Sequence, residues 1–153
     1  MPELLLTLLL WIDQHSALEY RPAWGRPAVE RLERRELVLS MFREEVPAFL
    51  SEEDLDNLEQ SVAAIYNHDT RTMLVASDID VRSAYGQAVL VHELVHFIQF
   101  EAGHDQEVRC LHALEEDAYT VQRRFMETKG LEPDFDAFTV VVRSMCPEEL
   151  SMR

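Results

Sequence analysis

The chain has 153 residues, 47% of them hydrophobic and 28% charged, so it is long enough to bury a substantial core and shows no composition shift that would mark a second domain. Its 29 acidic residues outnumber its 14 lysines and arginines, which gives a formal net charge of −15. Arg31, Arg34 and Arg35 alternate with glutamates and form no basic stripe. Because such a surface repels a phosphate backbone, the composition argues against nucleic acid as a partner and predicts a single domain over residues 1–153.

The first apolar run, Leu4 to Trp11, is too short to cross a bilayer. It lacks the features of a secretion signal, because Glu3 stands where basic residues are needed and no small-residue cleavage site follows. We expect a buried first helix over residues 3–16, no membrane span, and a cytoplasmic location in preference to export. The alternative is an exported mature protein.

The next segment predicts mixed local structure. Residues 20–28 contain two prolines and a glycine, which indicates an irregular connection. The apolar run Glu36–Phe42 favours a short buried strand. Ser51, followed three residues later by Asp54, resembles a capping box that begins a short helix.

Two β-prone runs, Ser61–Tyr66 and Arg71–Ala76, flank the polar residues 67–70 and predict a hairpin. A strand edge beside a functional site can bind an extended peptide by backbone pairing, although the hairpin can equally be an ordinary cover for the core. A helix is expected from about Ser83 to Glu101, with Gly103 just beyond its end. Further helices should follow, the first over residues 107–129.

His92, Glu93 and His96 form an HExxH motif within the helix over residues 83–101. Residues four apart lie on one helix face, so both imidazoles can reach a single ion while Glu93 faces water beside it. A catalytic zinc site needs three protein ligands, so a third must come from elsewhere in the chain.

The three-histidine pattern fails, because Gln99 and Ala102 stand where it requires glycine and histidine. His104 would have to reach back from a loop. On a helical wheel, Glu115 lies roughly 70° from the centre of the apolar face of the following helix, whereas Glu116 points away from it. That face is formed by Leu111, Leu114, Ala118, Val121 and Phe125. Glu115 is therefore the expected third ligand.

The segment Val91–His96, followed by Cys110 and by the ExxAYxxQ residues Glu115, Ala118, Tyr119 and Gln122, resembles zincin-like metallopeptidases of the gluzincin type. It is similar in particular to small bacterial HExxH-domain proteins, and the resemblance covers residues 60–130 well. It implies a zincin-like α+β fold, mainly helical with a small antiparallel sheet or hairpin beside the HExxH helix. It also implies a hydrolytic Zn²⁺ bound by His92, His96 and Glu115.

Tyr119 departs from the family pattern, since many gluzincins have aspartate at this position. Its phenol could hydrogen bond to a histidine or to a developing oxyanion, or it could simply pack on the HExxH helix. His112 and Tyr85 are the other candidates for the oxyanion donor. Gln99 can serve either as a partner of the histidines or, as the favoured interpretation, as an ordinary surface residue.

The predicted function is that of a zinc-dependent metallopeptidase acting on peptide or protein substrates, with Glu93 as the general base that takes a proton from zinc-activated water. One alternative is a noncatalytic zinc-stabilised binding module, whose coordination would be closed by His104 or Glu116. Another is a small-molecule amidase using the same site. Cys110 and Cys146 would form one disulfide in an exported protein and remain free thiols in a reducing cytoplasm.

Overall fold

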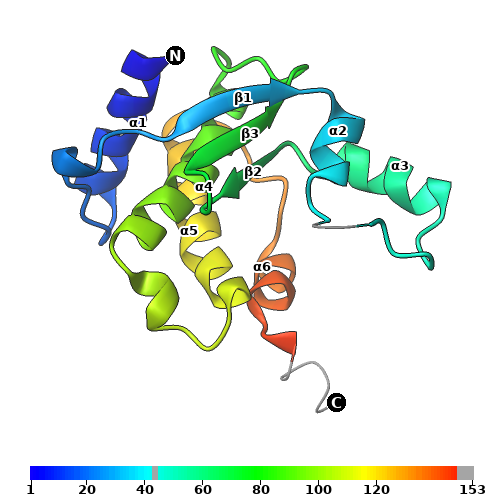
Figure 1. Ribbon diagram of the computed structural model, residues 1–153. Helices are drawn as coiled ribbons and strands as arrows, with labels where there is room; N and C mark the ends of the chain where they lie inside the picture. The colour runs from blue at the N-terminus through cyan, green and yellow to red at the C-terminus, as the bar shows by residue number, and fades with distance from the viewer. Residues whose placement is uncertain (43–44, 148–153) are drawn as a thin grey trace.

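The structure is a computed structural model and describes residues 1–42 and 45–147 (Figure 1). These residues form a mainly helical α+β domain with a small sheet, which confirms the predicted fold class. The helices in chain order are α1 (Pro2–His15), the 3-10 helix η1 (Pro22–Trp24), α2 (Arg34–Leu39), α3 (Glu52–Ser61), α4 (Ala84–Glu101), the 3-10 helices η2 (His104–Gln106) and η3 (Leu111–Leu114), α5 (Glu115–Thr128) and α6 (Ala137–Ser144). None of the helices in the described ranges is long and apolar enough to cross a membrane.

Helix α4 forms the centre of the molecule, and α1, α5 and the sheet pack around it (Figure 1). Thirteen of its eighteen residues are buried, which explains why its sequence is apolar on nearly all sides. Its first turn is capped by the Ser83 hydroxyl, which accepts a hydrogen bond from the Gly86 amide. A Cβ atom at Gly86 would lie 2.0 Å from the carbonyl oxygen of Asp80, so the close approach of this turn requires glycine.

The sheet has the strand order β1-β3-β2. Strands β2 (Ala64–Asn67) and β3 (Thr72–Ala76) form the predicted antiparallel hairpin, which is confirmed. Strand β1 (Ala28–Leu32) pairs with β3 in parallel and makes the sheet mixed, whereas the expectation from sequence is a small antiparallel sheet or hairpin. Strand β2 is left at the edge of the sheet, next to α4.

The strand predicted over Glu36–Phe42 is wrong, because these residues form the end of α2 and the turn after it. A strand would bury alternate residues, whereas here the adjacent Leu37 and Val38 are buried and Leu39 is 41% exposed. Arg35 holds α2 against α3 through ion pairs with three acidic residues of α3, Glu52, Asp56 and Glu59. Tertiary contacts therefore override the β-prone composition of this run.

The helix predicted over residues 107–129 begins eight residues later than expected, at Glu115. The backbone at Cys110 is extended and interrupts the helical pattern, and Leu111, which was assigned to the buried face, is 51% exposed. The rest of that face is confirmed, since Leu114, Ala118, Val121 and Phe125 are buried. Glu115 consequently lies in the first turn of α5, where the free backbone N–H groups of a helix favour a negative charge.

Candidate metal centre and its pocket

His92 and His96 project from α4 toward Glu115, which projects from α5. The Nε2 atom of His96 lies 2.7 Å from Glu115 Oε1, and the Nε2 atom of His92 lies 3.1 Å from Glu115 Oε2. The three potential ligand atoms lie within 4.8 Å of one another. The structure thus brings together the three residues that the sequence predicts as metal ligands.

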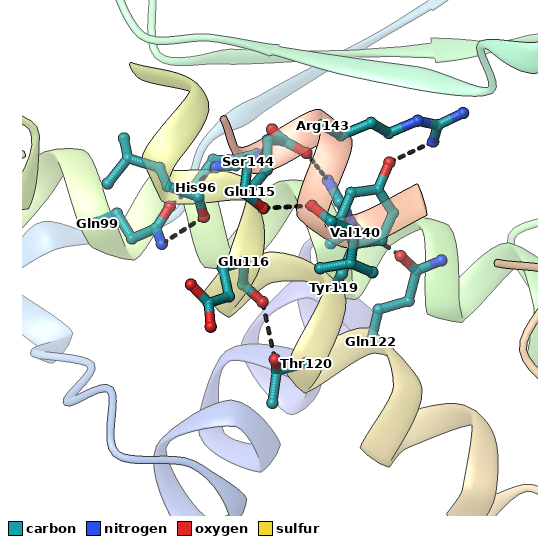
Figure 2. A network of polar contacts seen from close by, with 12 residues as sticks. His96, Gln99, Glu115, Glu116, Tyr119, Thr120, Gln122, Val140, Arg143 and Ser144 are labelled. Atoms are coloured by element: carbon teal, nitrogen blue, oxygen red, sulfur yellow. Dashed lines mark hydrogen bonds and ion pairs between the residues drawn. The ribbon is translucent and has the colours of Figure 1, made fainter. Parts of the chain in front are cut away.

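The other nitrogen of each imidazole contacts a glutamine. His92 Nδ1 lies 2.9 Å from the Gln122 side-chain oxygen, and His96 Nδ1 lies 2.9 Å from the Gln99 side-chain oxygen. Gln99 is fully buried, so its interpretation as a surface residue is wrong, and its amide nitrogen donates to the Leu114 carbonyl oxygen. The close-up in Figure 2 shows Gln99 and Gln122 on opposite sides of this group.

The amide of Gln99 fixes Nδ1 of His96 as a hydrogen-bond donor. Because its NH₂ group donates to a carbonyl, its oxygen is the atom that faces Nδ1, and Nδ1 must be the donor. In the metal-free protein Nε2 also carries a proton and donates it to Glu115; when this proton is lost, the Nε2 lone pair is directed to the same place. Two imidazoles fixed through Nδ1, together with one carboxylate, are the ligand set of a zinc site with an open position. The residues present therefore fit the ion.

His96 and Glu115 each stabilise the charged form of the other. Burial is the largest single effect on His96 and disfavours its charged form, but the hydrogen bond to Glu115, the charges of Glu93 and Glu115 and the contact with Gln99 together raise the pKa of His96 to about 9. Burial likewise opposes ionisation of Glu115, yet the hydrogen bonds with His92 and His96 hold its pKa well below the usual range. Glu115 is thus a permanent carboxylate whose two oxygens face the histidines.

Glu93 occupies the next position on α4 after His92 and is buried, with 8% of its surface exposed. Burial raises the pKa of this carboxyl, and the two histidines partly oppose the shift. A carboxylate that is poorly solvated is a stronger base than one in water. The side chain also lines the same pocket as the three potential ligands, which is the place required of a general base.

Tyr119 lies one helical turn after Glu115, with its ring edge against the His92 ring at a centroid separation of 4.6 Å. Its hydroxyl accepts a hydrogen bond from Arg143 on α6 (Figure 2). Sequence reasoning did not find Arg143, because no spacing relates α6 to the HExxH motif. Tyr119 therefore both packs on α4 and presents a phenol to the pocket.

The other residues considered as metal ligands or oxyanion donors lie outside the cluster of His92, His96 and Glu115. Glu116 is exposed, and neither Glu116 nor His104 belongs to the His92, His96 and Glu115 cluster among the described residues. Of the other proposed oxyanion donors, Tyr85 lines the pocket and His112 is an exposed residue of η3 that does not.

The pocket has a volume of about 730 Å³. One wall is the segment 61–66, which includes the first three residues of the edge strand β2, and other lining residues come from the first turns of α5 and from α6. A disulfide joins Cys110, just before η3, to Cys146, just after α6. Of the two alternatives predicted for the cysteines, the structure therefore has the bonded one, and it fixes α6 to the segment that leads into Glu115.

Fold and site together define an α+β domain in which two adjacent helices direct two histidines and a glutamate, able to hold a metal ion, into one pocket. The family described as "Domain of unknown function (DUF6647)" matches residues 1–150, so the chain belongs to this family. No curated protein and no solved structure matches the chain.

Proposed function

We propose that the protein is a zinc-dependent metallopeptidase. The observation that carries this proposal is the convergence of both Nε2 atoms on the Glu115 carboxylate, with Nδ1 of each imidazole held by a glutamine. When bound to His92, His96 and Glu115, a zinc ion supplies a Lewis acid that lowers the pKa of water to about 7 and polarises a carbonyl group.

Glu93 is the residue that moves the proton. As the oxygen of water bonds to the carbonyl carbon of the substrate, the Glu93 carboxylate takes the water proton. It then donates this proton to the leaving nitrogen as the C–N bond breaks, so that an acid and an amine result. Burial of Glu93 favours the protonated form between the two steps.

Tyr119 is proposed as the donor to the developing oxyanion. Its oxygen already accepts from Arg143, which leaves its own proton available for donation. Its ring contact with His92 keeps it beside the proposed metal ligands. Preorganised donors of this kind typically contribute about 10²–10³-fold in rate.

The edge strand favours a peptide over a small amide as substrate. Within the described chain, β2 pairs with β3 on one side only, and its residues line the pocket. An extended peptide can add to such an edge through main-chain hydrogen bonds, with alternate side chains pointing into the pocket.

The test is zinc analysis combined with digestion of an unbiased peptide library. We expect about one zinc per chain in the wild type, in Glu93→Gln and in Glu116→Ala, and none in His96→Ala or Glu115→Ala. Glu116→Ala is the matched control, because it removes the same charge from the neighbouring exposed position. The wild type should cleave peptides and Glu93→Gln should not.

Three results would contradict the proposal. Equal zinc content in Glu115→Ala and the wild type would remove the assigned ligand set. A zinc-loaded wild type that is as inert as Glu93→Gln would indicate the noncatalytic binding module instead, and cleavage confined to small amides would indicate an amidase.

A further inference from the structure

Arg143 is the one permanently cationic side chain that lines the pocket among the described residues. It projects from α6, whose position is fixed by the disulfide between Cys110 and Cys146. The same pocket is lined by the acidic residues Glu93, Glu115 and Asp134. In a chain with a net charge of −15, a cation at this place calls for a specific explanation.

Arg143 has no carboxylate partner in the described part of the chain, although acidic residues are abundant. Some arginines of this protein pair with acids, as Arg34 does with Asp78, whereas others, such as Arg26 and Arg124, donate to backbone carbonyl oxygens. Arg143 instead donates to the neutral hydroxyl of Tyr119. A guanidinium has five N–H donors, so most of its capacity to bind an anion is unused.

Arg143 is an exposed residue, but its guanidinium contacts the Tyr119 ring as well as the Tyr119 hydroxyl. Its carbon lies 5.7 Å from the centroid of the Tyr119 ring, and that ring lies 4.6 Å from the His92 ring. Arg143 is therefore at most about 10 Å from His92, the length of about three residues of extended chain. A planar donor fork that is fixed in this way is suited to bidentate binding of a carboxylate.

We propose that Arg143 binds a carboxylate of the substrate, within about three residues of the cleaved bond. This carboxylate is either the α-carboxylate at the end of a peptide or the side chain of an aspartate or glutamate. The inference rests on the proposed peptidase function and adds a substrate class to it: peptides with a negative charge near the scissile bond.

The first test compares peptide pairs that differ only in charge: a free C-terminus against its amide, and Asp or Glu against Asn or Gln at each position. The measured quantity is the ratio of kcat/KM values within each pair. We expect the wild type to prefer one charged member by about 10–100-fold, as for a charge-assisted hydrogen-bonded pair. The pair that shows the preference identifies the source of the carboxylate.

Arg143→Gln should bring this ratio close to one, and Arg143→Lys should leave a reduced preference. Arg124→Gln is the matched control, since it makes the same change in net charge at an exposed residue of α5 that donates to the His15 carbonyl oxygen. It should retain the wild-type ratio. If Arg143 only positioned Tyr119, its loss would lower kcat equally for both members of each pair. An unchanged ratio in Arg143→Gln, or no preference in the wild type, overturns the inference.

A second test separates the inference from the proposed function. The same peptides are titrated calorimetrically into zinc-loaded Glu93→Gln and into Glu93→Gln/Arg143→Gln. Tighter binding of the charged peptide that is lost in the double variant supports the inference even if the wild type cleaves nothing. Equal binding of the charged and neutral peptides to Glu93→Gln refutes it even if the wild type is an active peptidase.

Discussion

Replacing Gln99 by methionine should weaken zinc binding without touching a ligand. Gln99 is fully buried and bridges His96 Nδ1 and the Leu114 carbonyl oxygen, which lies one residue before Glu115. One side chain therefore sets the direction of one ligand and anchors the backbone beside another. Methionine has a similar length and is unbranched, so the change removes both hydrogen bonds and leaves little cavity.

The expected loss of zinc affinity and of stability in Gln99→Met follows from these two hydrogen bonds. Loss of an outer hydrogen bond to a metal-ligating histidine typically costs about 10–100-fold in metal affinity, which corresponds to about 1.4–2.7 kcal/mol. The Leu114 carbonyl oxygen and the His96 N–H group, both left unpaired in a buried site, should also lower the free energy of unfolding of the metal-free protein by about 1–3 kcal/mol each.

The assay is competition for zinc between the protein and a chelator of known affinity, accompanied by urea unfolding of the metal-free form. Gln122→Met is the matched comparison, because the Gln122 side chain hydrogen bonds to His92 and, in the described part of the chain, to no backbone carbonyl group. Gln122→Met should lower zinc affinity about as much as Gln99→Met does, but it should lower the free energy of unfolding less. A zinc affinity of Gln99→Met within threefold of the wild type, together with reduced stability, would refute the reasoning and leave Gln99 a purely structural residue.

Three further predictions concern stability. In the metal-free protein the folded-state pKa of His96, about 9, exceeds its ordinary value of 6.5. The stability that His96 contributes is therefore fully present below pH 6.5 and is lost as the pH rises through about 9. Urea unfolding measured from pH 5.5 to 9.5 should show this loss, and His96→Gln should make the free energy of unfolding less dependent on pH. Gly86→Ala should lower the free energy of unfolding by about 1–3 kcal/mol, because the new Cβ atom would clash with the Asp80 carbonyl oxygen. A change below about 0.5 kcal/mol in the same measurement would contradict this contact. In Cys110→Ser/Cys146→Ser the free energy of unfolding by urea should fall by about 4 kcal/mol, the chain-entropy value for cysteines 36 residues apart. An unchanged unfolding midpoint would show that the disulfide adds no constraint.

The sequence carries strong information about the parts of the site that lie on regular elements. The HExxH spacing placed His92 and His96 on one face of α4, and the apolar stripe of α5 distinguished Glu115 from Glu116. Ser83 and Gly103 gave the helix ends, since capping and a left-handed terminator act through local chemistry.

What the sequence could not supply depends on contacts between distant segments. Strand β1 has polar residues in its middle, such as Glu30 and Arg31, and becomes a strand through pairing with β3. Gln99 looks like a surface residue until the carbonyl group of Leu114 is placed beside it. Arg143 has no motif around it, and only the packing of α6 against α5 brings it to Tyr119.

The parallel pairing of β1 with β3 has a consequence for the order of folding. Ala28 pairs with Thr72, 44 positions further along the chain, and α1 packs on α4 across a still longer stretch, whereas the β2–β3 and α4–α5 contacts join elements that lie close together in the sequence. Contacts that span a long stretch of chain form slowly, so the docking of α1 on α4 and of β1 on β3 is expected to limit the folding rate. His92 and Glu115 are 23 residues apart and belong to the fast, local part. A metal ion present from the start of refolding can therefore meet its ligands before the sheet is complete.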